Sequence, residues 1–189
     1  VTRGFVMTSL RLETLKLPVA DLGPENPLPA LLMTPDMHQV ENTEGIPPDM
    51  LENIGYGRLP NILPYTLQDG YSREKKLQEL KVAVLENDIL KATFLLDYGG
   101  RLYSLFHKPS NRELLSVNPV FQPAHLALRN AWFSGGVEWN IGTIGHTPFT
   151  CAPMFAEKLE DQEGRPVLRL YEWERIRQVT YVLDFYLPE

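Results

Sequence analysis

The sequence predicts an all-β fold, an antiparallel β-sandwich, and two observations carry that prediction. First, short apolar segments recur along the second half of the chain, separated by clusters of Gly, Asp, Asn, Ser and Pro. Second, residues 178–187 alternate strictly, with Val179, Tyr181, Leu183, Phe185 and Leu187 on one face. Short strands with one apolar face and turn residues between them are typical of antiparallel sandwiches.

The N-terminal part is predicted to hold one strand and a long arm. Residues 8–17 alternate apolar and polar side chains, with a slip between Leu12 and Leu15 that predicts a bulge or bend. Prolines then recur from Pro18 to Pro35, which excludes a regular helix or a central strand. Residues 36–70 are expected to form an ordered arm across the domain surface, with a flexible linker as the alternative. The apolar anchors of this arm are Ile54, Tyr56, Leu59, Ile62, Leu63 and Tyr65.

The rest of the chain is predicted to consist mainly of strands. Ser72–Leu80 is the exception, with one or two helical turns expected and Ser72 as their cap. Extended segments follow from Lys81 onwards, and a hairpin is expected around residues 161–164. Residues 1–189 are therefore interpreted as a single domain, with the N-terminal strand and proline-rich arm over 1–70 and antiparallel sheets over 71–189.

Composition and charge narrow the classes of function. The net charge of −6 argues against a nucleic-acid partner and against an anchor on an anionic membrane surface. The sequence shows neither a signal peptide nor an apolar run of membrane-spanning length, so that a cytoplasmic protein without a membrane partner is expected. With one cysteine, Cys151, no intrachain disulfide can form. An uncharged ligand such as a sugar is compatible with this balance.

One segment, residues 131–149, is the candidate for a small-molecule site. It combines two Trp, two Phe, four Gly, one carboxylate and one His in nineteen residues. Glycine allows close approach of the backbone to a ligand, and aromatic faces beside a few polar groups are the usual lining of a pocket. The candidate catalytic residues are Glu138 and His146, and the candidate substrate-binding residues are Arg129, Trp132, Trp139, Asn140 and Phe149.

Structural alternatives stay open for each of these residues. For any one of the aromatic side chains a place in the hydrophobic core is favoured. Glu138 is also compatible with a solvent-facing strand position, and His146 with a loop hydrogen bond. Glu172 and Glu174 share one strand face; solvated rim charges are favoured there over an acid–base pair.

No metal site and no cofactor are expected. The four histidines have no paired spacing, and a single cysteine forms no zinc pattern. Gly99–Gly100 is not followed by the spacing of a phosphate-binding loop, and no serine lies in a nucleophile elbow.

Several motifs together are similar to those of a known family. They are Leu85–Asn87, Tyr98–Leu105, Asn118–Val120, Leu128–Trp132 and Ser134–Asn140, with Asn26–Pro29 and Leu63–Tyr65 in the arm. With these motifs the chain resembles family 5107 of the domains of unknown function, which is grouped with galactose mutarotase-like proteins and often precedes tetratricopeptide repeats.

The resemblance implies a galactose mutarotase-like supersandwich that carries a sugar on its concave face, and the chain would be the N-terminal portion of it. Members of that group hold the sugar with amides, arginines and histidines, and a late glutamate acts as base. Glu138 and His146 lie nearest to such roles. A tetratricopeptide-type domain on the C-terminal side is the implied partner segment.

Three hypotheses of function follow. The first is a carbohydrate-active enzyme, an epimerase or a glycoside hydrolase. In it Glu138 is the base or hydroxyl clamp and His146 the acid; Arg129 and Asn140 position the sugar, and Trp132 and Trp139 stack on it. The second is a non-catalytic sugar-binding module. The third is a module for protein contacts, made through the arm and an open strand edge.

Overall fold

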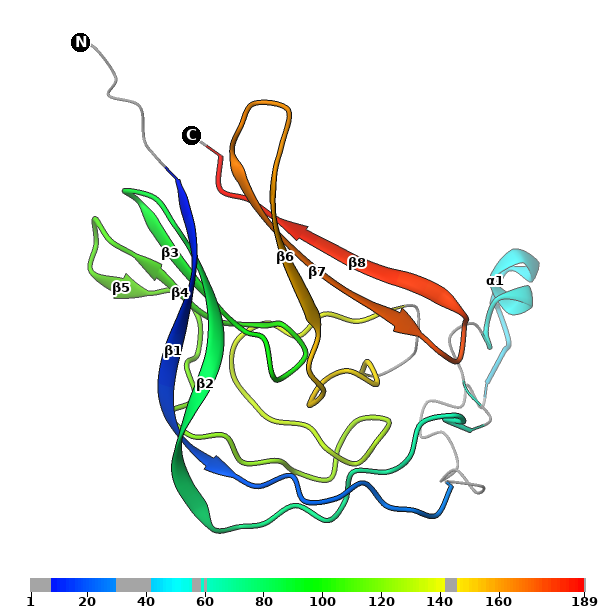
Figure 1. The fold of residues 1–189 in the computed structure, drawn as a ribbon. Coiled ribbons are helices and arrows are strands. Elements are labelled where there is room, and N and C mark those ends of the chain that lie inside the picture. The colour runs from blue at the N-terminus through cyan, green and yellow to red at the C-terminus, as the bar shows by residue number, and fades with distance from the viewer. Residues whose placement is uncertain (1–7, 30–41, 56–58, 60, 142–145, 189) are drawn as a thin grey trace.

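The structure is a computed structural model that describes residues 8–29, 42–55, 59, 61–141 and 146–188, and it confirms the all-β prediction (Figure 1). One sheet has the strand order β1-β2-β3-β4-β5 and the other β6-β7-β8, and all pairings between neighbours are antiparallel. The strands of the first sheet are β1 (Ser9–Ala20), β2 (Lys75–Glu86), β3 (Leu90–Leu95), β4 (Arg101–His107) and β5 (Arg112–Glu113). Those of the second are β6 (Phe155–Glu160), β7 (Pro166–Glu174) and β8 (Val179–Phe185).

The hairpin predicted around residues 161–164 joins β6 to β7. Oδ1 of Asp161 accepts hydrogen bonds from the backbone N–H groups of Glu163 and Arg165, and Gly164 takes the left-handed conformation that the turn requires. The alternation of β8 is also confirmed from Tyr181 onwards, whereas Val179 at the start of the strand is 41% exposed. Tyr181 is buried while its neighbours Thr180 and Val182 are exposed, so the strand turns one face to the core and one to solvent.

The predicted bulge in β1 is wrong. Twelve consecutive residues of β1 pair with β2 without any shift of register. The alternation slips because the two ends of this strand bury opposite faces: Leu10 belongs to one hydrophobic core, and Leu17 and Val19 belong to another. Leu12, between them, is 75% exposed. The strand also continues through Pro18, as an edge strand can.

The helical turns predicted for Ser72–Leu80 are wrong as well. Residues from Lys75 onwards already belong to β2, and all twelve residues of this strand pair with β1. Apart from Leu80, residues 75–81 are exposed, so the apolar pattern at this end carries little information about strand structure. Pairing with a strand more than fifty positions away decides the conformation.

Two hydrophobic cores cover both faces of the first sheet. Between the sheets, Ala83, Leu85 and Phe94 pack against Leu168 and Leu170 of the second sheet. On the opposite face, strand residues pack against aromatic side chains from the loops. This second cluster comprises Leu17, Val19, Leu80, Val82, Val84, Leu95, Tyr98, Tyr103, Phe121 and Phe133. The long loops after β5 therefore form part of the core.

Two of the predicted anchors of the arm are buried: Ile62 at 0% and Tyr65 at 3% exposure. Its backbone is tied to the loops, because the N–H of Gln68 donates to the carbonyl of Arg129 at 2.7 Å. Leu63 is 41% exposed and is not an anchor, and Tyr56 lies outside the described residues. The short helix α1 (Pro48–Glu52) also lies in the arm.

No helix in the described part of the chain is both long enough and apolar enough to cross a lipid bilayer.

Acid is expected to weaken the ion pairs of Glu86, which connect β2 with β1 and with the turn after β4. A hydrogen bond from Lys108, and secondarily one from Arg11, lowers the pKa of Glu86, against the effect of burial. A carboxyl whose pKa is lowered by folding stabilises the fold above its ordinary value of 4.5, and that contribution is lost as the pH falls through the folded value. Because the pair is partly exposed, Glu86→Gln is expected to cost about 1 kcal/mol or less at pH 6 and almost nothing at pH 3.

Urea unfolding of the two proteins at both pH values measures this difference. Glu79→Gln, on the same strand and with an exposed ion pair to Lys16, is the control. A cost of Glu86→Gln that is equal at pH 3 and pH 6 contradicts the assignment.

Candidate functional site

The Gly135–Gly136 motif brings the candidate segment against the start of β4. The N–H of Val137 donates to the carbonyl of Leu102 at 2.9 Å, and the N–H of Gly136 donates to the carbonyl of Ser116 at 2.9 Å. Gly136 has φ +65°, and a Cβ at this position would lie 2.3 Å from the oxygen of Leu102. Only glycine permits this approach. The turn therefore sets the position of Glu138, two residues later.

Glu138 lies at the centre of a hydrogen-bonded cluster. Its Oε2 accepts from the indole Nε1 of Trp132 at 2.9 Å and lies 2.7 Å from Nδ1 of His146. Its Oε1 accepts from the hydroxyl of Thr150. The Glu138 side chain is 14% exposed, so the carboxylate is not the solvent-facing strand residue of the structural alternative.

Arg101, the first residue of β4, supplies a buried cation to this cluster. Its side chain is 3% exposed, and its Nη2 lies 3.8 Å from Oε2 of Glu138. Nη1 donates to the carbonyls of Phe133 and Gly135, and the guanidinium carbon lies 3.7 Å from the centre of the Phe133 ring. Burial lowers the pKa of Arg101, and the charge of Glu138 opposes that shift. Nε and Nη2 are buried and have no hydrogen-bond partner among the described residues.

The charge of Glu138 also acts on the hydroxyl of Tyr181, which is buried, and on the thiol of Cys151, which is half-buried. The hydroxyl of Tyr181, from β8, has no hydrogen-bond partner among the described residues. Burial first, and the charge of Glu138 second, raise the pKa of this hydroxyl. Burial raises the pKa of the Cys151 thiol to about 12, so the thiol stays protonated near neutral pH and is not a nucleophile.

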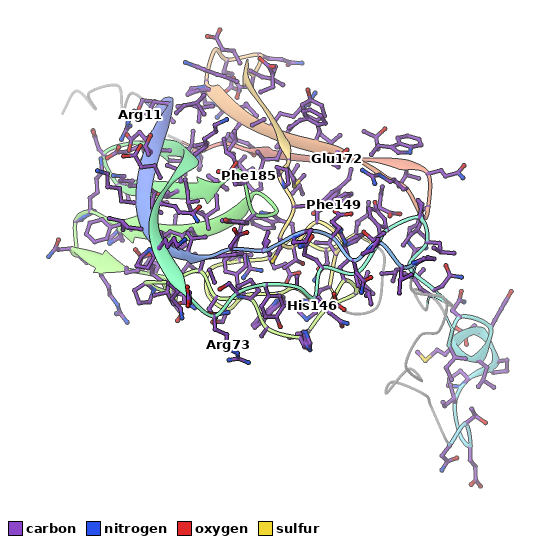
Figure 2. All side chains as sticks on the ribbon, turned by 60° about the horizontal axis from the view of Figure 1, so that its bottom comes forward. Arg11, Arg73, His146, Phe149, Glu172 and Phe185 are labelled. Carbon is purple, nitrogen blue, oxygen red and sulfur yellow. The ribbon has the colours of Figure 1, made fainter. Side chains whose placement is uncertain are left out.

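His146 is the more exposed member of the central pair. Its side chain is 28% exposed, and its ring lies 5.7 Å from the Trp132 ring. Figure 2 shows His146 near the edge of the molecule, whereas Phe149, three residues later, lies in the interior. Nδ1 is engaged with Glu138, which leaves Nε2 as the ring nitrogen for a ligand. A carboxylate on Nδ1 that fixes the tautomer and orientation of the ring is a common feature of acid–base sites.

Asn140 supports the cluster from the loop. Its Oδ1 accepts a hydrogen bond from the N–H of Thr147 at 3.0 Å, and the carbonyl oxygen of Thr147 lies 3.0 Å from Oγ1 of Thr150. The remaining chain atoms of the loop, at residues 142–145, lie outside the described residues. Asn140 therefore helps to hold the chain segment that carries His146 and Thr150.

Three predicted site residues make no side-chain hydrogen bond to Glu138 or His146 among the described residues. Arg129 donates to the carbonyl of Thr66 at 2.8 Å and pairs with Glu25 at 2.6 Å, which ties the loop to the arm. Trp139 donates its indole N–H to the carbonyl of Gly100 at 2.9 Å and packs on the core between the sheets. Phe149 is 3% exposed, and its ring stacks on Tyr181.

Three of the seven predicted residues, Glu138, His146 and Trp132, are thus in direct contact, and Asn140 adjoins them. Sequence reasoning missed Arg101, Thr150 and Tyr181. The signal for Arg101 was its place directly after two glycines, where a charged residue begins an apolar strand. Tyr181 carries no such signal, because it fits the apolar face of its strand.

Glu174 is not a solvated rim charge, in contrast to the prediction. It is 1% exposed, and its carboxylate accepts hydrogen bonds from the hydroxyl of Tyr65 and from the backbone N–H groups of Ile176 and Arg177. All these partners come from the arm or from the turn after β7. Glu174 therefore holds the turn after β7 against the arm, and none of these partners belongs to the Glu138 cluster.

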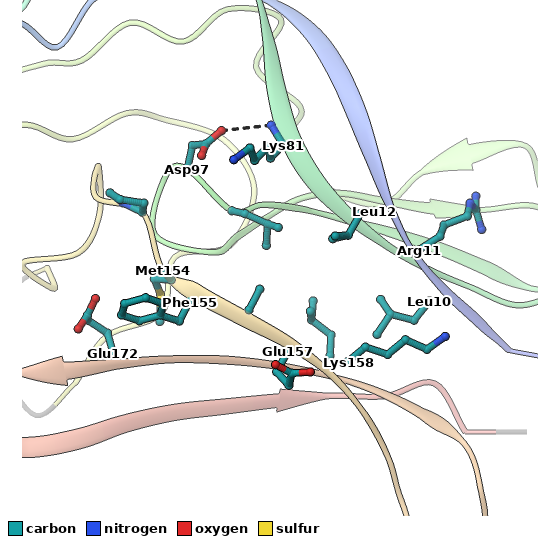
Figure 3. A pocket seen from close by; sticks show the side chains of 14 residues that line it. Leu10, Arg11, Leu12, Lys81, Asp97, Met154, Phe155, Glu157, Lys158 and Glu172 are labelled. Carbon is teal, nitrogen blue, oxygen red and sulfur yellow. Dashed lines mark hydrogen bonds between the residues drawn. The ribbon is translucent and has the colours of Figure 1, made fainter.

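A groove of about 550 Å³ opens at a different place, between the N-terminal half of β1 and β6 (Figure 3). Its walls are largely apolar, with Leu12 and Phe155 exposed at the surface and Leu168 at the base. Charged side chains such as Arg11 and Lys158 border it. None of the seven predicted site residues lines this groove.

Comparison with known proteins places the chain among domains without an assigned function. The sequence model of DUF5107, described as a domain of unknown function, matches residues 58–189. A solved structure, that of a TPR-domain containing protein from Parabacteroides distasonis ATCC 8503, is similar with a TM-score of 0.63 and 21% sequence identity. The likeness covers 88% of this chain and 24% of that one, so the chain spans about a quarter of the length of that protein. At this identity the likeness shows the fold alone.

Proposed function

The chain belongs to the DUF5107 family, and we propose that it is a carbohydrate-active domain in which His146 transfers protons and Glu138 orients it. The observation that carries the proposal is the 2.7 Å contact between Oε2 of Glu138 and Nδ1 of His146, with the histidine the more exposed of the two. A histidine held in this way exchanges protons through Nε2. Epimerisation of a sugar and cleavage of a glycosidic bond both need such a group.

The contacts of the carboxylate favour His146 over Glu138 as the proton-transfer group. Both oxygens of Glu138 already accept hydrogen bonds, from Trp132, Thr150 and His146. A carboxylate that is engaged and 14% exposed is suited to orient a neighbour and poorly suited to reach a sugar. From the sequence, Glu138 was expected to be the base or hydroxyl clamp and His146 the acid. In this proposal His146 is the proton-transfer group and Glu138 orients it.

Carbohydrate is the proposed ligand class on three grounds. Trp132 offers a flat apolar face with a fixed indole N–H beside His146, and such faces stack on the C–H side of sugar rings. The net charge of −6 suits an uncharged ligand. The motifs are similar to those of galactose mutarotase-like proteins, and the proposal includes their supersandwich fold, a cytoplasmic location and a tetratricopeptide-type segment as neighbour.

His146→Gln is expected to reduce turnover of a saccharide substrate by about 100-fold or more, because general acid–base groups contribute at least that factor. The protein as it is encoded in full is screened against arrayed saccharides with product analysis, and kcat is then compared between variants. His125→Gln is the matched control, since His125 is exposed and packs on Tyr71, away from the cluster. Unchanged kcat in the folded His146 variant overturns the proposed role.

A second candidate, a module for protein contacts, is favoured by the groove. Over its N-terminal half, β1 has no strand partner among the described residues on the side that faces away from β2, and β6 has none on the side that faces away from β7. Residues of both strands line the groove. An extended peptide that adds a strand to such an edge is the partner chemistry.

The same saccharide screen separates these candidates through tryptophan fluorescence. A carbohydrate bound at this site quenches the fluorescence of Trp132. The quenching is therefore expected to disappear in Trp132→Phe. It is expected to persist in Trp173→Phe, because Trp173 lies 49% exposed on the second sheet. Saturable quenching without product indicates a binding module. A protein contact module shows neither quenching nor product.

A further inference from the structure

We propose that Arg101 is the positioning residue of this site, and that its buried guanidinium fixes the Glu138 carboxylate against His146. The inference rests on the proposed function and deepens it, because it names the group that keeps the proton-transfer pair aligned. It concerns a residue that is almost fully shielded from solvent, since its side chain is 3% exposed.

The guanidinium is held rigidly from two sides. Nη1 donates to the carbonyls of Phe133 and Gly135, and the guanidinium plane lies over the ring of Phe133. A cation packed on an aromatic face and bonded to two carbonyls has little freedom to move. Arg101 is thus a fixed point from which a neighbouring charge can be oriented.

The second end of the guanidinium faces the carboxylate. Nη2 lies 3.8 Å from Oε2 of Glu138, the same oxygen that contacts His146 and Trp132. The indole of Trp132 and the hydroxyl of Thr150, which donate to this carboxylate, carry no charge, and His146 is charged only when protonated. Arginine, in contrast, remains charged at every pH the protein meets. Arg101 therefore supplies a permanent cation to Glu138, whatever the protonation state of His146.

A role limited to the Gly135 turn does not account for this arrangement. The two carbonyls of the turn are satisfied by Nη1 alone. Nε and Nη2 remain without a hydrogen-bond partner among the described residues, although each is fully buried. Burial of a cation with unpaired N–H groups is costly, and the adjacent carboxylate of Glu138 offsets part of that cost.

Arg101→Met tests the inference through two NMR signals of the protein as it is encoded in full. Nitrogen chemical shifts report the tautomer of His146, and hydrogen exchange reports the indole N–H of Trp132. We expect His146 to lose its single Nδ1–H tautomer and the Trp132 indole to exchange about 10-fold faster or more, the factor that corresponds to one ordinary hydrogen bond. The Trp139 indole, bonded to Gly100, is the internal control and should keep its signal.

Arg101→Lys retains the charge and is expected to restore part of both signals. In a folded Arg101→Met protein, an unchanged His146 tautomer together with unchanged Trp132 exchange overturns the proposal. Neither signal needs a substrate. A negative saccharide screen therefore contradicts the proposed function and leaves this inference standing, whereas unchanged NMR signals contradict this inference alone.

The double variant Arg101→Met/Glu138→Gln covers the case in which Arg101→Met folds but is too unstable for the NMR measurements. If the two side chains are coupled by charge, removal of the unpaired carboxylate raises the urea midpoint of the double variant above that of Arg101→Met. A double variant that is no more stable than Arg101→Met overturns the proposal.

Discussion

Glu174→Ala is expected to lower the free energy of unfolding by about 3 kcal/mol, because it leaves several buried donors without an acceptor. The backbone N–H groups of Ile176 and Arg177 donate to the two oxygens of this carboxylate, at 3.0 Å and 2.7 Å. The hydroxyl of Tyr65 donates to it at 3.1 Å and in turn accepts from the N–H of Arg175 at 3.0 Å. The variant therefore loosens both the β7–β8 turn and the attachment of the arm.

Urea unfolding of Glu174→Ala and Glu172→Ala measures this effect. Glu172 lies on the same strand face, is partly exposed, and accepts a hydrogen bond only from the N–H of Trp173 among the described residues, so it is the matched control. We expect Glu172→Ala to change stability by about 0.5 kcal/mol or less. Equal losses in the two variants contradict the structural assignment of Glu174.

Gly136→Ala is expected to lower the free energy of unfolding by about 3 kcal/mol or more, because strain and a backbone clash act together. The residue has φ +65°, and the added Cβ would lie 2.3 Å from the oxygen of Leu102. This oxygen accepts the hydrogen bond from Val137 that holds the segment on β4. Relief of the clash therefore moves Glu138 away from Arg101.

Gly164→Ala is the control for Gly136→Ala. Gly164 also has a positive φ, of +76°, but a Cβ there meets nothing within 4 Å. Its substitution isolates the cost of the left-handed conformation, which is about 1 kcal/mol. Chemical unfolding of both variants, with the Trp132 indole signal as a readout of the site, separates strain from clash. Similar losses in the two variants contradict the close approach of Gly136 to β4.

These two positions show that the site depends on contacts made by the backbone. The Gly136 turn sets where Glu138 lies relative to β4, and the Glu174 network holds the turn that follows β7 and leads into β8, the strand of Tyr181. The candidate site thus draws on both sheets and on the loops between them. A variant with lost activity is informative only when its stability has been measured beside it.

The local sequence was sufficient to predict the class of fold and several elements. The period of two in residues 178–187 predicts β8, and Asp161 and Gly164 predict the hairpin. β3 and β4 lie among the extended segments that were expected from Lys81 onwards. These features depend on neighbours in the chain, since alternation and turn chemistry act over a few residues. The cluster of glycine and aromatic residues likewise indicated where Glu138, His146 and Trp132 lie together.

The tertiary structure decided what depends on residues distant in the chain. The strand structure of residues 75–80 follows from pairing with β1, and the slip in β1 follows from two cores on opposite faces. Arg101 is 37 positions from Glu138, and Tyr65 is 109 positions from Glu174. Burial turns such distant charged and polar partners into strong constraints, because in a medium of low polarity each group needs its counterpart, and no local pattern records which counterpart the fold supplies.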